Sequence, residues 1–472
     1  MGVIRQCLLF LFIILASPYL KGQATKPYTV NGYKGIWFTL GQFYDYGDKY
    51  SGGLGTYTAK HRPLAIYDSV AHQTFFVYGG TTKAKAKHLL CMIGSFDHTT
   101  GMVSKPRIVF DKLGVDDPHD NPSIALDESG YIWVFISGRG RKRPGYKYRS
   151  LQPHSIANFE QISEEEMTYP QIWWIQGKGF FHFFTKYTGV RELYFETSSD
   201  GKDWTADQKL AGIIGQPGEK SGHYQVSYHR KDKVGTFFSR HPNGNVDRRT
   251  NLYYVESSDM GQSWHTASGR SLPLPIVEVE SSALVVDYES KRKNVYLKDM
   301  QYDEQGRPIC LYLTSGGHEP GPENSPRDWQ VSFWRNGQWH TRKITISDHN
   351  YDMGSLWIEG RIWRVVAPTM NGPQLHGGGG EIEQWVSLDE GETWMLSRRI
   401  SSSSRTNHNY IRKVHGGQSD FLYFWADGNP DDFSRSRLYF ADADGQVWQL
   451  PYRMRRTWAK PGGAATRSAP AA

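Results

Sequence analysis

A run of polar residues in the first third of the chain contains side chains suited to proton transfer. Residues 116–123 read Asp-Asp-Pro-His-Asp-Asn-Pro-Ser and lead into an apolar segment, with a tight turn at 127–130. His119 lies in this run, and Arg139 follows at the end of the next apolar segment. An imidazole exchanges protons near neutral pH, and a guanidinium grips a carboxylate with two parallel hydrogen bonds. We therefore expect both at one end of neighbouring strands, although a histidine beside aspartates often only makes structural hydrogen bonds.

Similar polar groups recur further along the chain, each next to an apolar segment. Taken singly, a tyrosine or arginine usually packs or forms a surface ion pair. Together, histidine, tyrosine and arginine side chains form a set that can abstract a proton beside a carboxylate. The residues that we assign to this set, besides His119 and Arg139, are Tyr169, Arg191, Tyr224, His241, Arg248 and Arg249.

A repeated turn motif indicates the elements that position these groups. Residues 257–264 and 387–394 both fit S-x-D-x-G-x-x-W, and residues 198–204 contain a shorter copy. Each copy follows an aromatic-rich segment, so Asp and Gly form a tight turn between two strands. The copies lie roughly 60 and 130 residues apart, which is one and two units of a repeat. This spacing predicts an all-β fold, a single seven-bladed β-propeller.

Composition agrees with this fold class and excludes others. The chain has 49 glycines and 23 prolines, and 14% of its residues are aromatic. Such frequent turn residues exclude a helical bundle, and the aromatic content provides a core that a disordered chain lacks. The net charge of +7 is dispersed, so we expect no nucleic-acid partner.

The two ends of the chain differ from the part between them. Residues 1–22 contain Arg5 followed by a short apolar run, which is typical of a secretory signal peptide and too short to span a membrane. We expect the propeller to occupy residues 23–453 and residues 454–472 to be a disordered basic tail. The protein should thus be secreted or periplasmic, without a membrane span, and monomeric.

No other catalytic pattern is present in the sequence. It contains no G-x-S-x-G elbow, no H-E-x-x-H, no Walker loop and no C-x-x-C. A sialidase arginine triad with its F/Y-R-I-P segment is also missing, while a glycosidase with paired carboxylates stays open. Cys91 and Cys310 suit buried apolar positions. We predict no cofactor and no catalytic metal. The histidines that could bind a metal lie further apart in the sequence than the ligands of a compact zinc motif; they are His318, His349, His376, His408 and His415.

The order of the short motifs resembles a known family. Residues 119–122 read H-x-N-P, residues 168–170 T-Y-P, residues 191–194 R-E-L-Y and residues 250–254 T-N-L-Y-Y. In this order they resemble the BNR-4 repeat propellers that include ulvan lyases. The chain is more similar to a subgroup acting on L-rhamnose-α-1,4-D-glucuronate ends of arabinogalactan and gum arabic. Ulvan lyases carry two histidines on the first hairpin, and here Arg139 takes the second position.

The resemblance implies a polysaccharide lyase acting by β-elimination. Arg249 would neutralise the glucuronate carboxylate, with Arg191 and Arg248 as neighbours that exchange roles with it. An imidazole titrates near ~6.5 and a phenol near ~10, so His119 is the better base, and Tyr169 suits the acid, or the base if an arginine lies nearby. The resemblance supports a role for both residues without assigning which is base and which is acid. The remaining substrate contacts would come from Gln42, Arg139, Tyr224 and His241.

Two alternatives to the lyase remain open in the sequence. Related α-L-rhamnosidases use one histidine on the propeller face opposite the lyase site, in the segment after G-I-W-F. In this chain Gln42 occupies the position that we align with that histidine. Glutamine is no general base, which disfavours the hydrolase. A non-catalytic carbohydrate-binding propeller is the second alternative.

Overall fold

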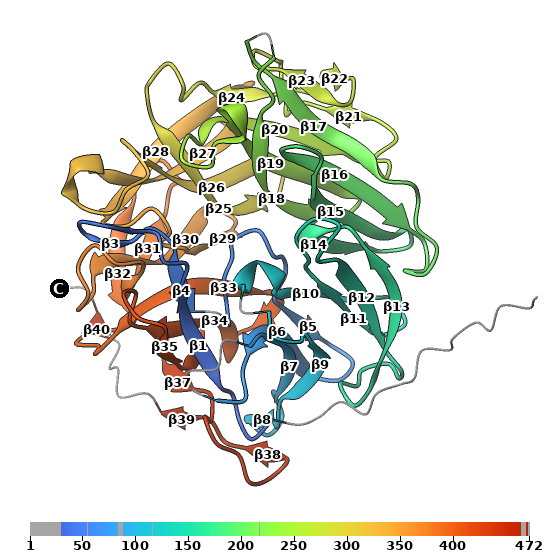
Figure 1. The fold of residues 1–472 in the computed structure, drawn as a ribbon, viewed down its shortest axis with the longest axis vertical. Helices are drawn as coiled ribbons and strands as arrows, with labels where there is room; N and C mark the ends of the chain where they lie inside the picture. The colour runs from blue at the N-terminus through green and yellow to red at the C-terminus, as the bar shows by residue number, and fades with distance from the viewer. Residues whose placement is uncertain are drawn as a thin grey trace, which may run out of the picture.

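The protein is built almost entirely from β-strands arranged around a common centre (Figure 1). The computed structural model describes residues 30–53, 55–83, 88–115, 117–216, 218–463 and 469–470. Its helical elements are the single 3-10 turns η1 (Pro118–Asp120), η2 (Pro242–Gly244) and η3 (Pro322–Asn324). Among these described residues, no helix has the length and apolar character that crossing a membrane requires.

Most sheets are antiparallel meanders in which consecutive strands pair. Four of these groups stand as separate sheets around the first half of the ring. They are β10 (Pro122–Leu126), β11 (Ile132–Ile136), β12 (Gly145–Ser150) and β13 (Phe159–Glu165); β14 (Thr168–Ile175), β15 (Gly179–Tyr187), β16 (Arg191–Ser198) and β17 (Gln208–Ile214); β18 (Gly222–Arg230), β19 (Lys233–His241) and β20 (Thr250–Ser257); and β25 (Asn294–Tyr302), β26 (Pro308–Ser315), β27 (Arg327–Arg335) and β28 (Gln338–Ser347).

Further groups are linked to one another by single bridges near the channel. They are β29 (Ser355–Glu359), β30 (Ile362–Asn371), β31 (Gly380–Ser387) and β32 (Met395–Arg399); β33 (Asn407–Gln418), β34 (Phe421–Gly428), β36 (Leu438–Ala441) and β37 (Val447–Gln449); and β5 (Ala65–Asp68), β6 (Gln73–Gly80), β7 (Leu90–Asp97), β8 (Met102–Ser104) and β9 (Arg107–Asp111). Further short strands extend these sheets. They are β21 (Trp264–His265), β22 (Ser271–Leu272), β23 (Ile276–Glu278) against β17, β24 (Leu284–Val286) against β20, and β40 (Ala469–Pro470) against β32.

The two ends of the described chain meet and close the ring. Strand β1 (Gly35–Thr39) lies between β4 (Ser51–Gly53) and β35 (Ser434–Ser436). Strand β38 (Trp458–Ala459) pairs with β8, and β39 (Gly462–Gly463) pairs with β37. Two short strands within residues 454–463, which we expected in a disordered tail, therefore pair with the first and last sheets. The expected signal peptide, residues 1–22, lies outside the described residues.

The repeated turn motif acts as predicted. Asp259 Oδ1 accepts the N–H of Ser263 at 2.9 Å, and the indole of Trp264 donates to the Gly261 carbonyl at 3.1 Å. The copy at Asp389 makes the same two bonds. Gly261 has a φ of +86°, which an L side chain rarely adopts, so the glycine of the motif is required. These turns and the meander sheets confirm an all-β propeller.

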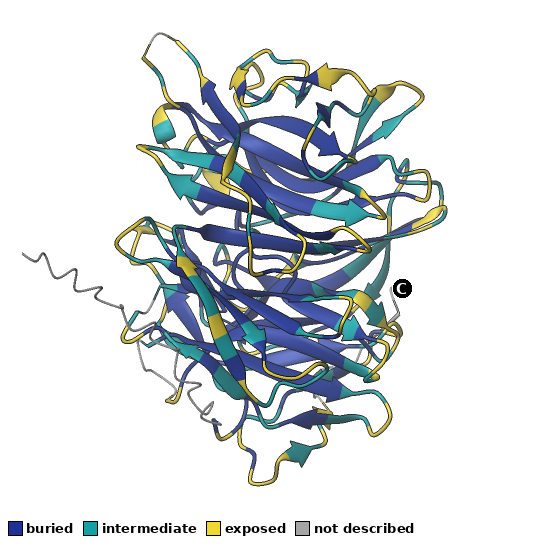
Figure 2. Cartoon of the chain, turned by 90° about the vertical axis from the view of Figure 1, so that its right-hand side faces the viewer, coloured by how far each residue is buried: buried dark blue, intermediate teal, exposed yellow. Residues whose placement is uncertain are grey.

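A buried ion pair crosses the centre of the ring. Asp299 on inner strand β25 binds the guanidinium of Arg62 and accepts the N–H of Leu356, on β29, at 2.7 Å. Figure 2 shows that the inner strands around this centre are buried, while exposed residues concentrate in the loops. The carboxylate of Asp299 thus ties three separate segments together inside the channel.

We predict that Asp299→Asn lowers the free energy of unfolding by about 3–5 kcal/mol, because it leaves the Arg62 charge buried without a counter-charge. Denaturant unfolding of the variant beside the wild type measures this loss. The matched control is Asp232→Asn, since Asp232 is exposed and lies 3.6 Å from Lys178; it should change stability by less than about 1 kcal/mol. Equal effects of the two substitutions would show that the central ion pair does not stabilise the ring.

Candidate active site

A pocket opens where the inner strands begin at one end of the channel. It holds about 740 Å³ of space, part of it open to solvent. Strands β14, β18, β25 and β33 contribute Tyr169, Tyr224, Tyr296 and Tyr410 to its wall. All but two of the predicted site residues line this pocket. They are Gln42, His119, Arg139, Tyr169, Arg191, Tyr224 and Arg249.

The two predicted residues outside the lining lie in different surroundings. His241 is buried behind the wall, with its ring 4.6 Å from that of Tyr224. The side chain of Arg248 is 59% exposed and pairs with Glu289 at 3.3 Å. The structure therefore separates Arg248 from its neighbour Arg249, and the expected exchange of roles between them has no geometric basis.

Arg249 is a buried cation surrounded by phenols. Its guanidinium donates to the hydroxyls of Tyr351 and of Tyr50, the latter at 3.3 Å, and its Nε donates to the Val246 carbonyl at 2.8 Å. The guanidinium carbon also lies 4.9 Å from the ring centre of Tyr224. Within the described residues, no carboxylate forms an ion pair with Arg249. A buried charge without a counter-ion attracts an anion.

Two more cations in the pocket have no carboxylate partner among the described residues. Arg191 donates its Nε to the Tyr187 hydroxyl at 3.2 Å. The ammonium of Lys60 lies 4.9 Å from the ring centre of Tyr224. Burial and the charge of Arg249 hold the pKa of Lys60 well below its usual range. The two arginines thus concentrate positive charge that an acidic ligand would neutralise, and such a ligand would favour the protonated form of Lys60.

His119 is oriented by an aspartate in the turn that carries it. Asp117 caps η1 by accepting the His119 N–H at 3.0 Å, and the same carboxylate contacts His119 Nδ1. Arg139 donates to Asp117 at 2.8 Å and Arg143 at 2.6 Å. Burial raises the pKa of Asp117, but the contact with His119 and then the two arginines outweigh burial and hold that pKa well below its usual range. Burial lowers the pKa of His119 although Asp117 raises it. A neutral imidazole with Nδ1–H on Asp117 leaves Nε2 as the proton acceptor, 3.4 Å from the Tyr57 hydroxyl.

Tyr169 reaches the pocket through an irregularity in its strand. Its φ is +58°, and the pairing of β14 with β15 shifts register between Thr168 and Gln171. Such a bulge re-aims a side chain. The Tyr169 ring lies 5.8 Å from that of His119. Burial raises the pKa of Tyr169 well above its usual value, so the phenol keeps its proton at neutral pH.

Gln42 lines the same pocket as His119. It precedes the hairpin of β2 (Phe43–Tyr44) and β3 (Gly47–Asp48), and its N–H donates to Asp48 at 3.2 Å. The hairpin docks on the far side of the mouth, where Tyr44 contacts His318 at 3.2 Å. The expectation that Gln42 lies on the opposite face is therefore wrong, because the segment that carries it lines the same pocket as His119.

Several lining residues were not predicted from the sequence. Lys298 donates to the Asn350 carbonyl at 2.8 Å, and burial lowers its pKa to about 7. No local pattern marks these residues, because irregular loops or unremarkable strand positions carry them. The others are Tyr50, Tyr57, Lys60, Tyr296, Tyr351 and Tyr410.

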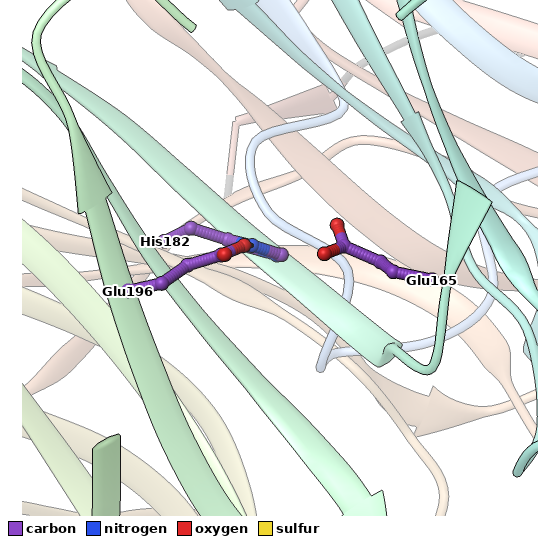
Figure 3. Close-up of side chains that lie close together, drawn as sticks. All are labelled: Glu165, His182 and Glu196. Atoms are coloured by element: carbon purple, nitrogen blue, oxygen red, sulfur yellow. Dashed lines mark hydrogen bonds and ion pairs between the residues drawn. The ribbon is translucent and has the colours of Figure 1, made fainter. Parts of the chain in front are cut away.

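A separate buried cluster has ligand atoms close enough for a metal ion. Glu165, His182 and Glu196 offer atoms within 4.8 Å of one another (Figure 3). The ammonium of Lys147 contacts Glu165 at 2.7 Å and Glu196 at 2.8 Å, so this cation already offsets part of the carboxylate charge. Burial lowers the pKa of His182 to about 3. In the part of the chain that the structure describes, this is the only such group, and it forms an internal ion network.

We predict that Asp117→Asn lowers the pKa of His119 by about one pH unit or more, because the carboxylate that favours the imidazolium is removed. An NMR titration of the His119 ring measures this pKa. Glu128→Gln, an exposed change in the following turn, is the matched control and should leave the titration unchanged. An unaltered or higher pKa in Asp117→Asn would contradict the proposed orientation of the ring.

Comparisons with known proteins agree with this fold. The ulvan lyase of Nonlabens ulvanivorans is 19% identical over 362 residues, which cover 65% of this chain and 71% of that protein. A solved polysaccharide lyase PL25 ulvan lyase superposes with a TM-score of 0.70 at 15% identity, covering 88% of this chain and 96% of that chain. The polysaccharide lyase Uly1 gives a TM-score of 0.59 at 12% identity, covering 88% and 98%.

One family model matches more than half of the chain. The match spans residues 96–347, which include the turn η1 that carries His119 and the strands that carry Tyr169, Arg191 and Tyr224. The model describes BNR repeat-containing family members. The chain therefore belongs to the BNR repeat-containing family BNR_4.

Proposed function

We propose that the protein is a polysaccharide lyase that removes terminal L-rhamnose from rhamnose-α-1,4-glucuronate ends by β-elimination. The observation that carries this proposal is the set of cations without carboxylate partners, Arg249, Arg191 and Lys60, beside a neutral imidazole and a protonated phenol. The similarity to ulvan lyases supports it, and one solved PL25 ulvan lyase is bound to a GlcA(1-4)Rha3S unit.

The reaction needs three roles that this pocket can fill. Arg249 binds the glucuronate carboxylate and disperses the negative charge that develops when C5 loses its proton. Nε2 of His119 takes that proton, and the electron pair of the broken C5–H bond forms the C4–C5 double bond. The C4–O4 bond then breaks, and Tyr169 gives its proton to the departing rhamnose oxygen. The products are L-rhamnose and a 4,5-unsaturated uronate, without a metal or organic cofactor.

The positions of His119 and Tyr169 suit a glucuronate. In this sugar the C5 hydrogen and O4 lie on the same side of the ring, so base and acid must approach from one side. The two rings lie 5.8 Å apart on adjacent parts of the pocket wall. Arg139 is already paired with Asp117, so in this proposal it holds the base in place as well as lining the site.

The product distinguishes this proposal from its alternatives. An α-L-rhamnosidase releases rhamnose without an unsaturated uronate, and a binding propeller releases nothing. Gln42 lines the pocket but its amide cannot accept a proton from water. Gln42→His is therefore the informative variant if hydrolysis is found instead.

We also propose the setting in which the enzyme works. Residues 1–22 would direct export to the periplasm or the outside of the cell, where acidic plant-type polysaccharides are accessible. The described strands fall into seven sequential antiparallel groups, which supports a seven-bladed ring in one monomeric domain.

We predict that His119→Ala, Tyr169→Phe and Arg249→Ala each lower turnover on the order of 10²-fold or more, because each removes one of the three roles. The measurement is the absorbance of the unsaturated uronate formed from a rhamnose-capped glucuronide. Arg248→Ala is the matched control, since this neighbouring arginine is exposed, and it should keep the wild-type rate.

Each alternative has its own result in this assay. Wild-type rates in all three variants would place the reaction elsewhere on the protein. Rhamnose release without the double bond would contradict elimination. Binding of the glucuronide with no product over hours would indicate that the protein binds carbohydrate without catalysing a reaction.

A further inference from the structure

We propose that Tyr224 makes the pocket selective for acidic sugars by serving as its resident anion. In the empty site the Tyr224 phenolate balances Arg191 and Arg249, and it takes up one proton when a uronate carboxylate binds these cations. This inference rests on the proposed function, because it takes the uronate site as its starting point.

Tyr224 stands at the centre of the unpaired cations. The guanidinium carbon of Arg249 and the ammonium of Lys60 each lie 4.9 Å from the centre of its ring, and the guanidinium carbon of Arg191 lies 5.9 Å away. These cations come from three separate segments that the ring closure brings together. Tyr224 is the phenol whose ring contacts all three of these cations, whereas Tyr50, Tyr187 and Tyr351 each contact one arginine.

The other contacts of these cations are neutral oxygens. Arg249 has the hydroxyls of Tyr50 and Tyr351 and one carbonyl, and Arg191 has the Tyr187 hydroxyl. Within the described residues neither arginine forms an ion pair with a carboxylate. The empty pocket therefore lacks a permanent counter-charge, and ionisation of a phenol is the way in which this site can supply one.

The electrostatics distinguish Tyr224 from the other phenols. Burial raises its pKa, but the charges of Arg191 and Arg249 outweigh burial, and its pKa lies below the usual value. The hydrogen bond with Tyr169 and the charge of Arg139 act in the same direction. Burial keeps the pKa values of Tyr57, Tyr169 and Tyr351 well above their usual value.

The titratable groups that face Tyr224 come from every neighbouring segment. Tyr169 lies on β14 with its ring 5.6 Å away, His241 ends β19 at 4.6 Å, and burial holds its pKa well below the usual value. The loops and strands around them add the charged or titratable groups Tyr57, Lys60, Arg139, Arg191 and Arg249. Among these neighbours Lys60 is the second group whose protonation can respond to a bound anion.

The sign of the linkage follows from competition for the same cations. A bound carboxylate repels the phenolate, so binding raises the pKa of Tyr224 and draws in a proton. Affinity for a uronate is then constant below the pKa of Tyr224 in the free protein and falls by up to about tenfold per pH unit above it. A neutral sugar cannot replace the phenolate, so it gains nothing from these cations.

Calorimetric titration with methyl glucuronoside, in buffers of different ionisation enthalpy near pH 9, measures proton uptake directly. We expect net uptake in the wild type and a smaller uptake in Tyr224→Phe, which should also bind more tightly than the wild type at this pH. Lys60→Met is the control for the neighbouring amine and should keep the Tyr224 contribution. In parallel, the near-ultraviolet absorbance of phenolate should fall on binding in the wild type and stay constant in Tyr224→Phe.

The outcomes separate this inference from the proposed function. Binding with equal proton uptake in the wild type and Tyr224→Phe would overturn the role of Tyr224 while leaving the uronate site intact. Loss of all uptake in Lys60→Met would overturn it as well, because the amine would then be the group that titrates. Absence of any binding of methyl glucuronoside would contradict the uronate site itself and this inference with it.

Discussion

Burying a guanidinium without a carboxylate partner costs free energy, and the pocket at the channel mouth does this at Arg249. Phenol hydroxyls and aromatic faces from several strands compensate part of this cost. None of these groups is a permanent anion. The rest of the site is arranged around that charge: Arg191 and Lys60 add to it, and Tyr224 lies between them. A carboxylate is the ligand that this arrangement lacks, which links the fold to an acidic sugar.

At the centre of the same channel, the buried cation has a carboxylate partner. There, Arg62 is paired with Asp299, whose second oxygen accepts a backbone N–H. This fully satisfied carboxylate joins inner strands and contributes to the scaffold. At the mouth, the Asp117 carboxylate orients His119 and pairs with Arg139 and Arg143. Acidic groups are thus used for structure or for orienting the base, and the cations that face the pocket are left for the ligand.

Sequence reasoning predicted the features that depend on local spacing. The Asp259 turn closes within a few residues, so its Asp, Gly and Trp are visible as a motif. His119 precedes the first strand of one hairpin and Arg139 follows the second, so both lie at its open end. Features set by ring closure were not predictable. Lys60 and Tyr57 lie in an irregular loop that reaches the pocket only when the first and last sheets meet. Gln42 was expected on the opposite face because the sequence does not show that its segment lines the same pocket as His119. Two adjacent arginines at 248 and 249 look alike in sequence, yet one faces solvent and the other is buried.

The central claim is that the unpaired cations of the mouth bind a uronate carboxylate. A crystal structure of the protein with bound methyl glucuronoside tests it most directly. The account predicts the carboxylate within hydrogen-bonding distance of Arg249 and Arg191, with C5 facing His119 and O4 facing Tyr169. A glucuronoside whose carboxylate points to solvent, or one bound only at the outer surface of the ring, would contradict the account.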